Sequence, residues 1–209
     1  MKLYIYEHCP FCARTRYVGR MLGIEFEEVM LTYEDEATPV ALVGKKIVPI
    51  LEKDDGSIMP ESADIIAYFL SLKGQTFTQA LPTTLDWQSA TFPFNQKLGY
   101  PRMHYLPLGE FLTPESRVAW QAKKESATLN FEQLLVDTLM INQQTAPLLE
   151  HAEKNIQLVN GESTLPLFDQ AIYFSLLRVL VISPELTWPT ALITWLEKQS
   201  LATKIPLLR

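Results

Sequence analysis

Two cysteines, Cys9 and Cys12, are the only ones in the 209 residues of the chain, and they stand three positions apart in Cys9-Pro10-Phe11-Cys12. They follow an apolar, β-prone run at residues 3–6. Residues three apart in a first helical turn share one face, so Cys12 can reach a disulfide formed at Cys9 with little backbone movement. A Cys-x-x-Cys pair at a strand-to-helix junction indicates thiol–disulfide chemistry.

The position of the pair predicts different roles for the two thiols. Pro10 suits the first helical position, which leaves Cys9 as the helix cap, facing free N–H groups and the positive end of the helix dipole. Such a site lowers a thiol pKa below its usual value of about 8.5 and makes the thiolate a good leaving group. Three cations follow, with no acid before residue 24: Arg14, Arg16 and Arg20. We therefore expect Cys9 to be the nucleophile and Cys12 the resolving thiol, without a depressed pKa.

Two other interpretations of the cysteines stay open at this point. Structural zinc usually takes four Cys or His ligands, and the chain has no second Cys pair. Its three histidines, His8, His104 and His151, lack the spacing of a zinc site. We therefore expect no metal. The pair could also be inert core thiols, but the strand before it and the helix signals after it favour the redox interpretation.

Composition narrows the class of protein. Acids outnumber bases 24 to 18, which gives a net charge of −6 and no basic patch of the kind that nucleic-acid binding needs. The N-terminus is charged and β-like, unlike a signal peptide, and the longest aliphatic run, at residues 179–182, is too short to span a bilayer. The length suits two domains. We expect a cytoplasmic protein that binds neither nucleic acid nor membranes.

The first 72 residues alternate strand and helix signals. Strands are predicted at residues 2–6, 25–31, 48–53 and 57–59, and helices at 10–22, 35–43 and 62–72. Gly23 and Gly44 follow the first two helices, Asp54-Asp55-Gly56 supplies hairpin turn chemistry, and Ser62 is a good N-cap residue for the third helix. The order βαβαββα predicts a parallel strand pair, an antiparallel hairpin and a closing helix.

Strand signals vanish in the rest of the chain. A polar linker is predicted at residues 73–84, and helical spacing follows at residues 85–98, 114–140, 145–159, 168–181 and 189–200. An apolar stripe of core residues is expected at Leu129, Leu134, Leu135, Leu139 and Met140. The sequence therefore predicts an α/β domain followed by an all-α domain.

The chain resembles the glutaredoxin branch of the thioredoxin superfamily in the order and spacing of Cys9-Pro10-Phe11-Cys12, Val48-Pro49 and Glu61-Ser62. Its helical part resembles glutathione transferases, and the whole is similar to two-domain bacterial glutaredoxins of the glutaredoxin 2 type. That match is carried by residues 1–6, 48–51, 59–62, 98–102, 123–125, 159–162 and 176–178. It implies a thioredoxin-like domain at 1–72, a linker at 73–84 and a helical glutathione-transferase-like domain at 85–209.

The resemblance also implies a cytosolic, glutathione-dependent thiol–disulfide oxidoreductase, with glutathione as co-substrate. Val48 would precede a cis-proline, Pro49, and bind glutathione through its backbone like an added strand. The helix start at Glu61-Ser62 would hold the γ-glutamyl carboxylate. Tyr6 would pack beside the site, although a buried strand tyrosine explains it equally well. Partners would be glutathionylated or disulfide-containing proteins, and the protein is expected to be a monomer.

The sequence departs from the family pattern in two places. Phe11 stands where family members often carry tyrosine, so the redox potential or the choice of partner can differ. A Ser/Thr-x-x-Asp capping box is usual in a core helix of the transferase domain, but here Pro166 precedes Asp169 in place of the cap residue. Two alternative functions stay open: a cysteine-type glutathione transferase and a non-catalytic glutathione- or partner-binding module.

Overall fold

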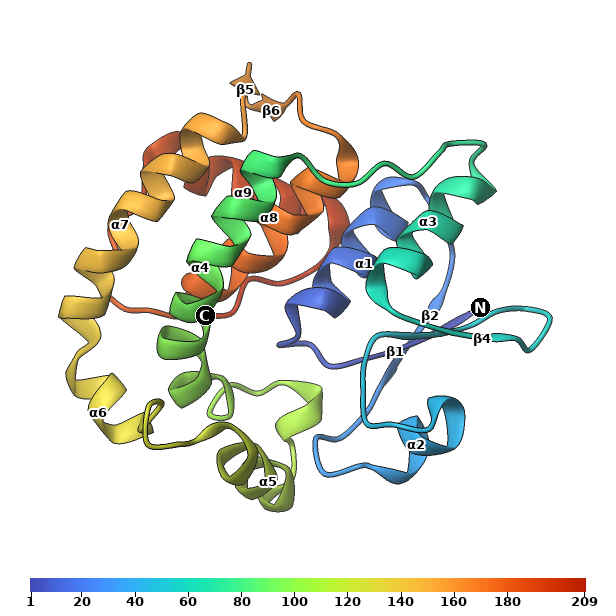
Figure 1. Ribbon diagram of the computed structural model, residues 1–209, viewed down its shortest axis with the longest axis horizontal. Helices are drawn as coiled ribbons and strands as arrows, with labels where there is room; N and C mark the ends of the chain where they lie inside the picture. The colour runs from blue at the N-terminus through green and yellow to red at the C-terminus, as the bar shows by residue number, and fades with distance from the viewer. The chain divides into compact units, whose positions relative to one another are not determined.

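The computed structural model describes residues 1–209. Its N-terminal part contains a four-stranded sheet (Figure 1). Its order is β2-β1-β3-β4. β1 runs parallel to β2 and antiparallel to β3, and β3 runs antiparallel to β4. The strand bounds are β1 (Lys2–Ile5), β2 (Glu27–Met30), β3 (Ile50–Glu52) and β4 (Ile58–Pro60). Leu3 and Ile5 are fully buried whereas Lys2 is exposed, as the period of two along a strand requires.

Three helices pack on this sheet: α1 (Pro10–Met21), α2 (Ala37–Val43) and α3 (Ser62–Leu72). α1 and α3 lie side by side on one face, and α2 lies on the other side (Figure 1). Gly19 of α1 permits close packing, because a Cβ there would stand 2.5 Å from the Phe26 ring and 3.0 Å from Phe69. The predicted order βαβαββα is confirmed. β1, β2 and β3 are shorter than predicted by one to three residues, and β4 has the predicted length but begins one residue later.

The second half is helical. Its bounds are α4 (Pro82–Met103), η1 (Gly109–Phe111), α5 (Pro114–Lys124), α6 (Phe131–Val136), α7 (Thr138–Asn155), α8 (Leu167–Leu180) and α9 (Thr190–Thr203). α4 packs against both α7 and α8 (Figure 1). α8 is the most deeply buried of these helices, since ten consecutive residues from Ala171 are buried. No helix combines the length and the apolar character that crossing a membrane would require.

Several predicted bounds in this half are wrong. The helix expected at 114–140 breaks after Lys124 and again at Asp137, and α7 then runs through the gap expected near residue 142. Because the second break interrupts the helical period, the expected core stripe fails. Leu134 is buried, but Leu139 and Met140 are 60% and 50% exposed, and Leu135 is exposed as well.

A small ribbon was also missed, in a region where no strand was expected. β5 (Leu158–Val159) pairs antiparallel with β6 (Glu162–Ser163). Asn160 and Gly161 join the two strands with φ values of 52° and 78°, a turn that asparagine and glycine tolerate. The short strands carry too few residues to show a period of two.

Asp169 has a different role from the capping acid expected at the start of α8. The N-cap of α8 is Pro166, which makes no side-chain cap bond. The fully buried Asp169 carboxylate instead accepts a hydrogen bond of 2.9 Å from the backbone N–H of Leu81, the N-cap residue of α4. It therefore holds the start of α4 against α8.

The chain divides into two compact units whose bounds differ from the predicted 1–72, 73–84 and 85–209. The first unit comprises Met1–Thr78 and Pro107–Lys123, and the second comprises Gln79–Leu106 and Lys124–Arg209. Residues 107–123 were expected in the helical domain. They group with the sheet because the Glu110 carbonyl accepts the N–H of Tyr33 and its carboxylate binds the turn after β1.

Candidate active site

Cys9 caps the N-terminus of α1. Its backbone is extended, with φ −68° and ψ 120°, and Pro10 occupies the first helical turn, as predicted. The Cys9 sulfur accepts the backbone N–H of Cys12 at 3.4 Å. Cys9 is 8% exposed and Cys12 is fully buried, and both are free thiols. The two sulfurs therefore share one helical turn, with Cys9 at its outer end.

The two thiols differ in acidity. A hydrogen bond from the Cys12 side chain, opposed by burial and helped by the charge of His8 and by the N–H groups of Cys12 and Phe11, lowers the pKa of Cys9 to about 6. Burial, together with the hydrogen bond to Cys9, raises the pKa of Cys12 well above its ordinary value. Both directions agree with the expectation that Cys9 is the more acidic of the two thiols, with Cys12 as the donor to it.

Of the three arginines expected to act on Cys9, Arg14 interacts electrostatically with it, whereas Arg16 and Arg20 pair with a carboxylate. Arg16 and Arg20 both bind Glu28 of β2, at 2.8 Å and 3.1 Å. Burial lowers the pKa of Arg14 to about 10, so Arg14 keeps its charge at neutral pH, and its guanidinium lies 4.7 Å from the centre of the Phe11 ring. Two of the three arginines therefore pair with Glu28.

His8 and Glu110 form a buried pair that the sequence analysis missed. The His8 Nδ1 atom lies 2.7 Å from Oε1 of Glu110, and the Glu110 side chain has no exposed surface. The same carboxylate accepts the backbone N–H groups of Glu7 at 3.0 Å and of His8 at 2.8 Å. No local pattern in the sequence links two residues about a hundred positions apart, so only the fold reveals the pair.

Tyr6 lies in an aromatic cluster under this turn. Its ring stacks on His8, with centroids 5.6 Å apart, and tilts against Tyr33 at 5.4 Å. Phe111 and Trp120 complete the cluster around His8, at 5.4 Å and 4.6 Å. Burial raises the pKa of Tyr6. Tyr6 thus supports the turn that carries Cys9, and it does not line the pocket described next.

The remaining residues singled out in the sequence come together in one pocket of about 160 Å³. The Val48–Pro49 peptide bond is cis, as predicted. The pocket joins the first turn of α1, the loop before β3 and the start of α3, and it is lined by Phe11, Ile47, Val48, Pro49, Glu61 and Ser62. Four of the five residues predicted to bind a ligand therefore lie together, beside the motif that holds the thiols.

The start of α3 differs from the predicted one. Glu61, and not Ser62, is the N-cap, and its side chain makes no cap hydrogen bond. Its φ of 71° lies in the left-handed region, which is uncommon for residues other than glycine and is found at functional sites. Ser62 occupies the first helical position. The start of α3 therefore lies at the pocket and has no cap side chain on its first-turn N–H groups, which suits an anion.

A larger pocket of about 460 Å³ lies within the helical unit, between α7 and residues 187–189. Neither cysteine lines this pocket, so the smaller pocket beside Cys9-Pro10-Phe11-Cys12 is the better candidate for the active site. Across the chain, no group of three or more His, Cys, Asp or Glu side chains is arranged to hold a metal ion.

Comparison with known proteins links both halves of the chain to thiol chemistry. Residues 83–209 match the family model described as the C-terminal domain of glutaredoxin 2, and residues 3–77 match that of the glutathione S-transferase N-terminal domain. The chain is 34% identical to glutaredoxin 2 of Escherichia coli strain K12, over all of this chain and 98% of that protein.

Solved structures agree. The structure of glutaredoxin 2 from Salmonella typhimurium in complex with glutathione superimposes with a TM-score of 0.88 at 34% identity, over 99% of this chain and 96% of that one. A glutathione S-transferase of Ceriporiopsis subvermispora, at 14% identity and a TM-score of 0.68, covers 100% of this chain and 98% of its own. The second similarity concerns the fold alone.

Proposed function

Because this chain belongs to the glutaredoxin 2 family of glutathione-dependent thiol–disulfide oxidoreductases, we propose that Cys9 is its nucleophile and Cys12 its resolving thiol. The observation that carries the proposal is the cap geometry: the Cys9 sulfur accepts the Cys12 N–H at 3.4 Å, and its pKa is lowered to about 6. Cys9 is partly accessible and ionised, whereas Cys12 is buried and protonated.

The first reaction is the removal of glutathione from a mixed disulfide. The Cys9 thiolate attacks the glutathione sulfur, the original S–S bond breaks, and the product thiol leaves as a thiolate that takes a proton from water. A free glutathione thiolate then attacks the glutathione sulfur bound to Cys9. Glutathione disulfide forms, and Cys9 departs readily because its thiolate is stabilised at the helix cap. One free glutathione is consumed, and it ends in glutathione disulfide together with the glutathione that came from the mixed disulfide.

Protein disulfides need both thiols. Cys9 attacks one sulfur of the substrate and forms a protein–protein mixed disulfide. Cys12 loses its proton as it attacks Cys9, which closes the Cys9–Cys12 disulfide and releases the reduced substrate. The raised pKa of Cys12 keeps it protonated until the Cys9 thiolate is consumed. Two glutathione molecules then reduce the Cys9–Cys12 disulfide.

Glutathione is assigned to the pocket of Phe11, Val48, Pro49, Glu61 and Ser62. The Val48 backbone would pair with the tripeptide as an added strand. The first-turn N–H groups of α3 would bind the γ-glutamyl carboxylate, since charge-assisted bonds of this kind contribute about 1.5–3 kcal/mol each. The uncapped start of α3 supports this placement. Tyr6 would contribute indirectly, because its ring stacks on His8 in the turn before Cys9.

The substrates proposed are glutathionylated and disulfide-containing proteins of a reducing compartment, and a cytoplasmic location is proposed with them. Both cysteines belong to the redox motif, and neither is used as a structural staple. A monomeric state is also proposed, and size-exclusion chromatography with light scattering tests it.

The deciding experiment is glutathione-coupled reduction of a mixed disulfide between glutathione and a small thiol. Wild type and Cys12→Ser should both be active, and Cys9→Ser should be inactive. Reduction of a protein disulfide should be lost in Cys9→Ser and in Cys12→Ser. Conjugation of glutathione to an electrophile that persists in Cys12→Ser, without disulfide reduction by wild type, would instead indicate a transferase.

A further inference from the structure

The turn between β1 and α1 is tied down by a carboxylate that the redox motif itself does not contain. Glu110 lies in η1, and all its surface is buried. Its two oxygens accept the N–H groups of Glu7 and His8, and one of them also binds His8 Nδ1 at 2.7 Å. In the reverse direction, the Glu7 carboxylate accepts the N–H of Gly109 at 2.8 Å. His8 is the residue directly before Cys9.

The Glu110 carboxylate is ionised, which fixes the direction of its bond to His8. Burial acts to raise the pKa of Glu110, but the hydrogen bond and the charge of His8 outweigh it and hold that pKa below its ordinary value. An ionised carboxylate only accepts hydrogen bonds, so Nδ1 of His8 is the donor. A carboxylate bound to one ring nitrogen orients an imidazole and fixes which ring nitrogen carries the donated proton.

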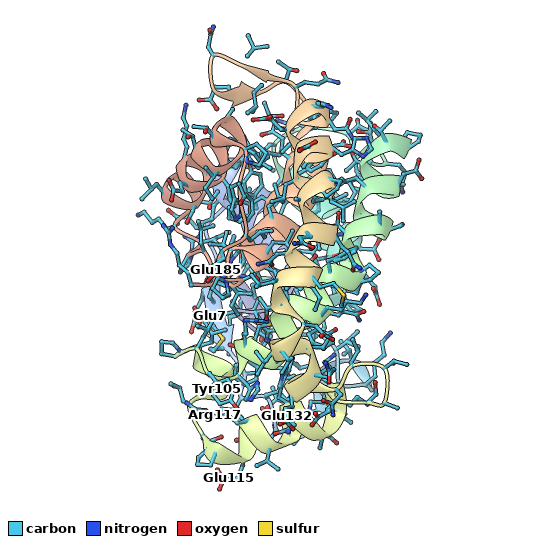
Figure 2. All side chains as sticks on the ribbon, turned by 90° about the vertical axis from the view of Figure 1, so that its left-hand side faces the viewer. Glu7, Tyr105, Glu115, Arg117, Glu132 and Glu185 are labelled. Atoms are coloured by element: carbon cyan, nitrogen blue, oxygen red, sulfur yellow. The ribbon has the colours of Figure 1, made fainter.

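The surroundings of His8 leave it little freedom. Rings of four residues pack around it, and His8 itself is 7% exposed. Arg117 of α5, labelled in Figure 2, donates from Nε to the Phe111 carbonyl at 2.9 Å and so fixes the segment that carries Glu110. The titratable and charged groups around this turn are Tyr6, Glu7, Cys9, Cys12, Arg14, Arg16, Tyr33, Asp35, Lys46 and Glu110.

We propose that Glu110 is a positioning residue for the redox reaction: through its bonds to His8 it holds a positive charge beside Cys9 and stabilises the thiolate. The proposal rests on the proposed function, in which Cys9 is the nucleophile. The attraction between His8 and Cys9 agrees with it, since the charge of His8 lowers the pKa of Cys9. Glu110 contacts neither cysteine, and its whole effect passes through His8.

The direction in which Glu110→Gln shifts the Cys9 pKa distinguishes an effect through His8 from a direct electrostatic effect of Glu110 on the thiolate. Glu110→Gln removes a negative charge, which taken directly should stabilise a nearby thiolate and lower the thiol pKa. If Glu110 acts through His8, the same substitution weakens the positive charge beside Cys9 and raises that pKa. The glutamine carbonyl can still accept backbone N–H groups, so the turn keeps much of its support.

The test measures thiolate absorbance against pH in a Cys12→Ser background, where Cys9 is the only thiol. We expect Glu110→Gln to raise the midpoint by about one pH unit, as an opposite charge within several ångströms does. The ratio of Cys9 alkylation rates at pH 8 and pH 6 should then rise about fivefold, as follows from the thiolate fractions for midpoints near 6 and 7. The matched control is Glu7→Gln, which removes a carboxylate from the same turn and should leave the midpoint unchanged or lower it.

A second variant isolates the route through His8. His8→Gln removes the charge, and we expect the same upward shift of the Cys9 midpoint. In that background, adding Glu110→Gln should raise the midpoint no further, because the two substitutions remove one shared interaction. Far-UV circular dichroism checks each fold, and if Glu110→Gln does not fold, His8→Gln carries the test.

Folded Glu110→Gln and His8→Gln variants with unchanged midpoints would overturn the proposal, as would additive shifts in the double variant. Unfolding of both would overturn it too, since the pair would then be a structural tie. Failure of the proposed function is distinguishable from these results: in that case Cys9→Ser keeps its activity, whatever the midpoints are.

Discussion

The N-termini of α1 and α3 belong to the same unit, but only α1 has a cap side chain that accepts a first-turn N–H group. At α1 the cap residue is Cys9, whose sulfur accepts the Cys12 N–H at 3.4 Å. At α3 the cap residue is Glu61, with φ 71° and no side-chain bond to the helix. One helix start is closed by a protein group, and the other is left for a ligand.

This difference shows how two similar helix ends support two different tasks. Both offer free N–H groups and a partial positive charge. At α1 that charge acts on a thiol covalently fixed at the cap, so it lowers a pKa. At α3 no side chain competes for the donors, so they remain available to a carboxylate from outside. The identity of the cap residue therefore decides whether a helix start tunes a reactive group or binds an anion.

The largest effect is expected at the cap of α1. Cys9→Ser keeps a hydrogen-bond acceptor for the Cys12 N–H but replaces the thiolate with a hydroxyl that does not ionise at neutral pH. We expect both mixed-disulfide and protein-disulfide reduction to fall to the uncatalysed rate in the glutathione-coupled assay. Substantial activity in a folded Cys9→Ser variant would show that the cap thiol is not the nucleophile.

The second largest effect is expected on the pKa of Cys9 when the side chain of Cys12 is removed. Cys12→Ala removes the side-chain donor that contributes most to the low pKa of Cys9. We expect the Cys9 absorbance midpoint to rise above about 6 by roughly one unit, and to stay below about 8.5 because the backbone donors remain. Cys12→Ser retains a donor and is the matched control, with a smaller rise. Equal midpoints in both variants would assign the low pKa to the backbone and His8 alone.

The low pKa of Cys9 also predicts how stability depends on pH. The folded value of about 6 lies below the unfolded value of about 8.5, so the thiolate contributes stability that is full above pH 8.5 and is lost as the pH falls through 6. A difference of about 2.5 units corresponds to roughly 3 kcal/mol.

Urea unfolding of the reduced protein at pH 6 and pH 8.5, beside Cys9→Ser, measures this term. Wild type should gain about 3 kcal/mol more than the variant over this range. A parallel pH dependence of the two proteins would contradict the cap electrostatics.

The smallest effect is expected at the start of α3. Ser62 occupies the first helical position and is not the cap, so Ser62→Ala should change the free energy of unfolding by less than about 0.5 kcal/mol. The apparent KM for a glutathione mixed disulfide should rise about three- to tenfold, because one donor to the carboxylate is lost while the backbone N–H groups remain. Ser71→Ala, at the other end of the same helix, should leave KM unchanged.

Residues 1–72 could be predicted well because their signals are local. Glycine after α1 and α2, the turn at Asp54-Asp55-Gly56 and the proline after Cys9 each fix an element end within a few residues. The pocket residues Val48, Pro49 and Ser62 came from a family resemblance, and the fold does bring them together.

The features that could not be predicted from the sequence depend on contacts between residues far apart in the chain. Glu110 binds the turn after β1 although it lies about a hundred residues further along the chain. Glu28 of β2 forms an ion pair with Arg16 of α1. The break at Asp137 exposes Leu139, which helical spacing alone had placed in the core. Even the cap of α3 shifted by one residue, because Glu61 adopts a backbone conformation that its residue type does not announce.

The comparison of the two helix starts is tested most directly by a crystal structure of Cys12→Ser after reaction with glutathione disulfide. The account predicts one glutathione joined to the Cys9 sulfur, with its γ-glutamyl carboxylate on the N–H groups at the start of α3 and its backbone paired with Val48. A glutathione bound elsewhere, or a carboxylate that leaves the start of α3 unoccupied, would contradict it.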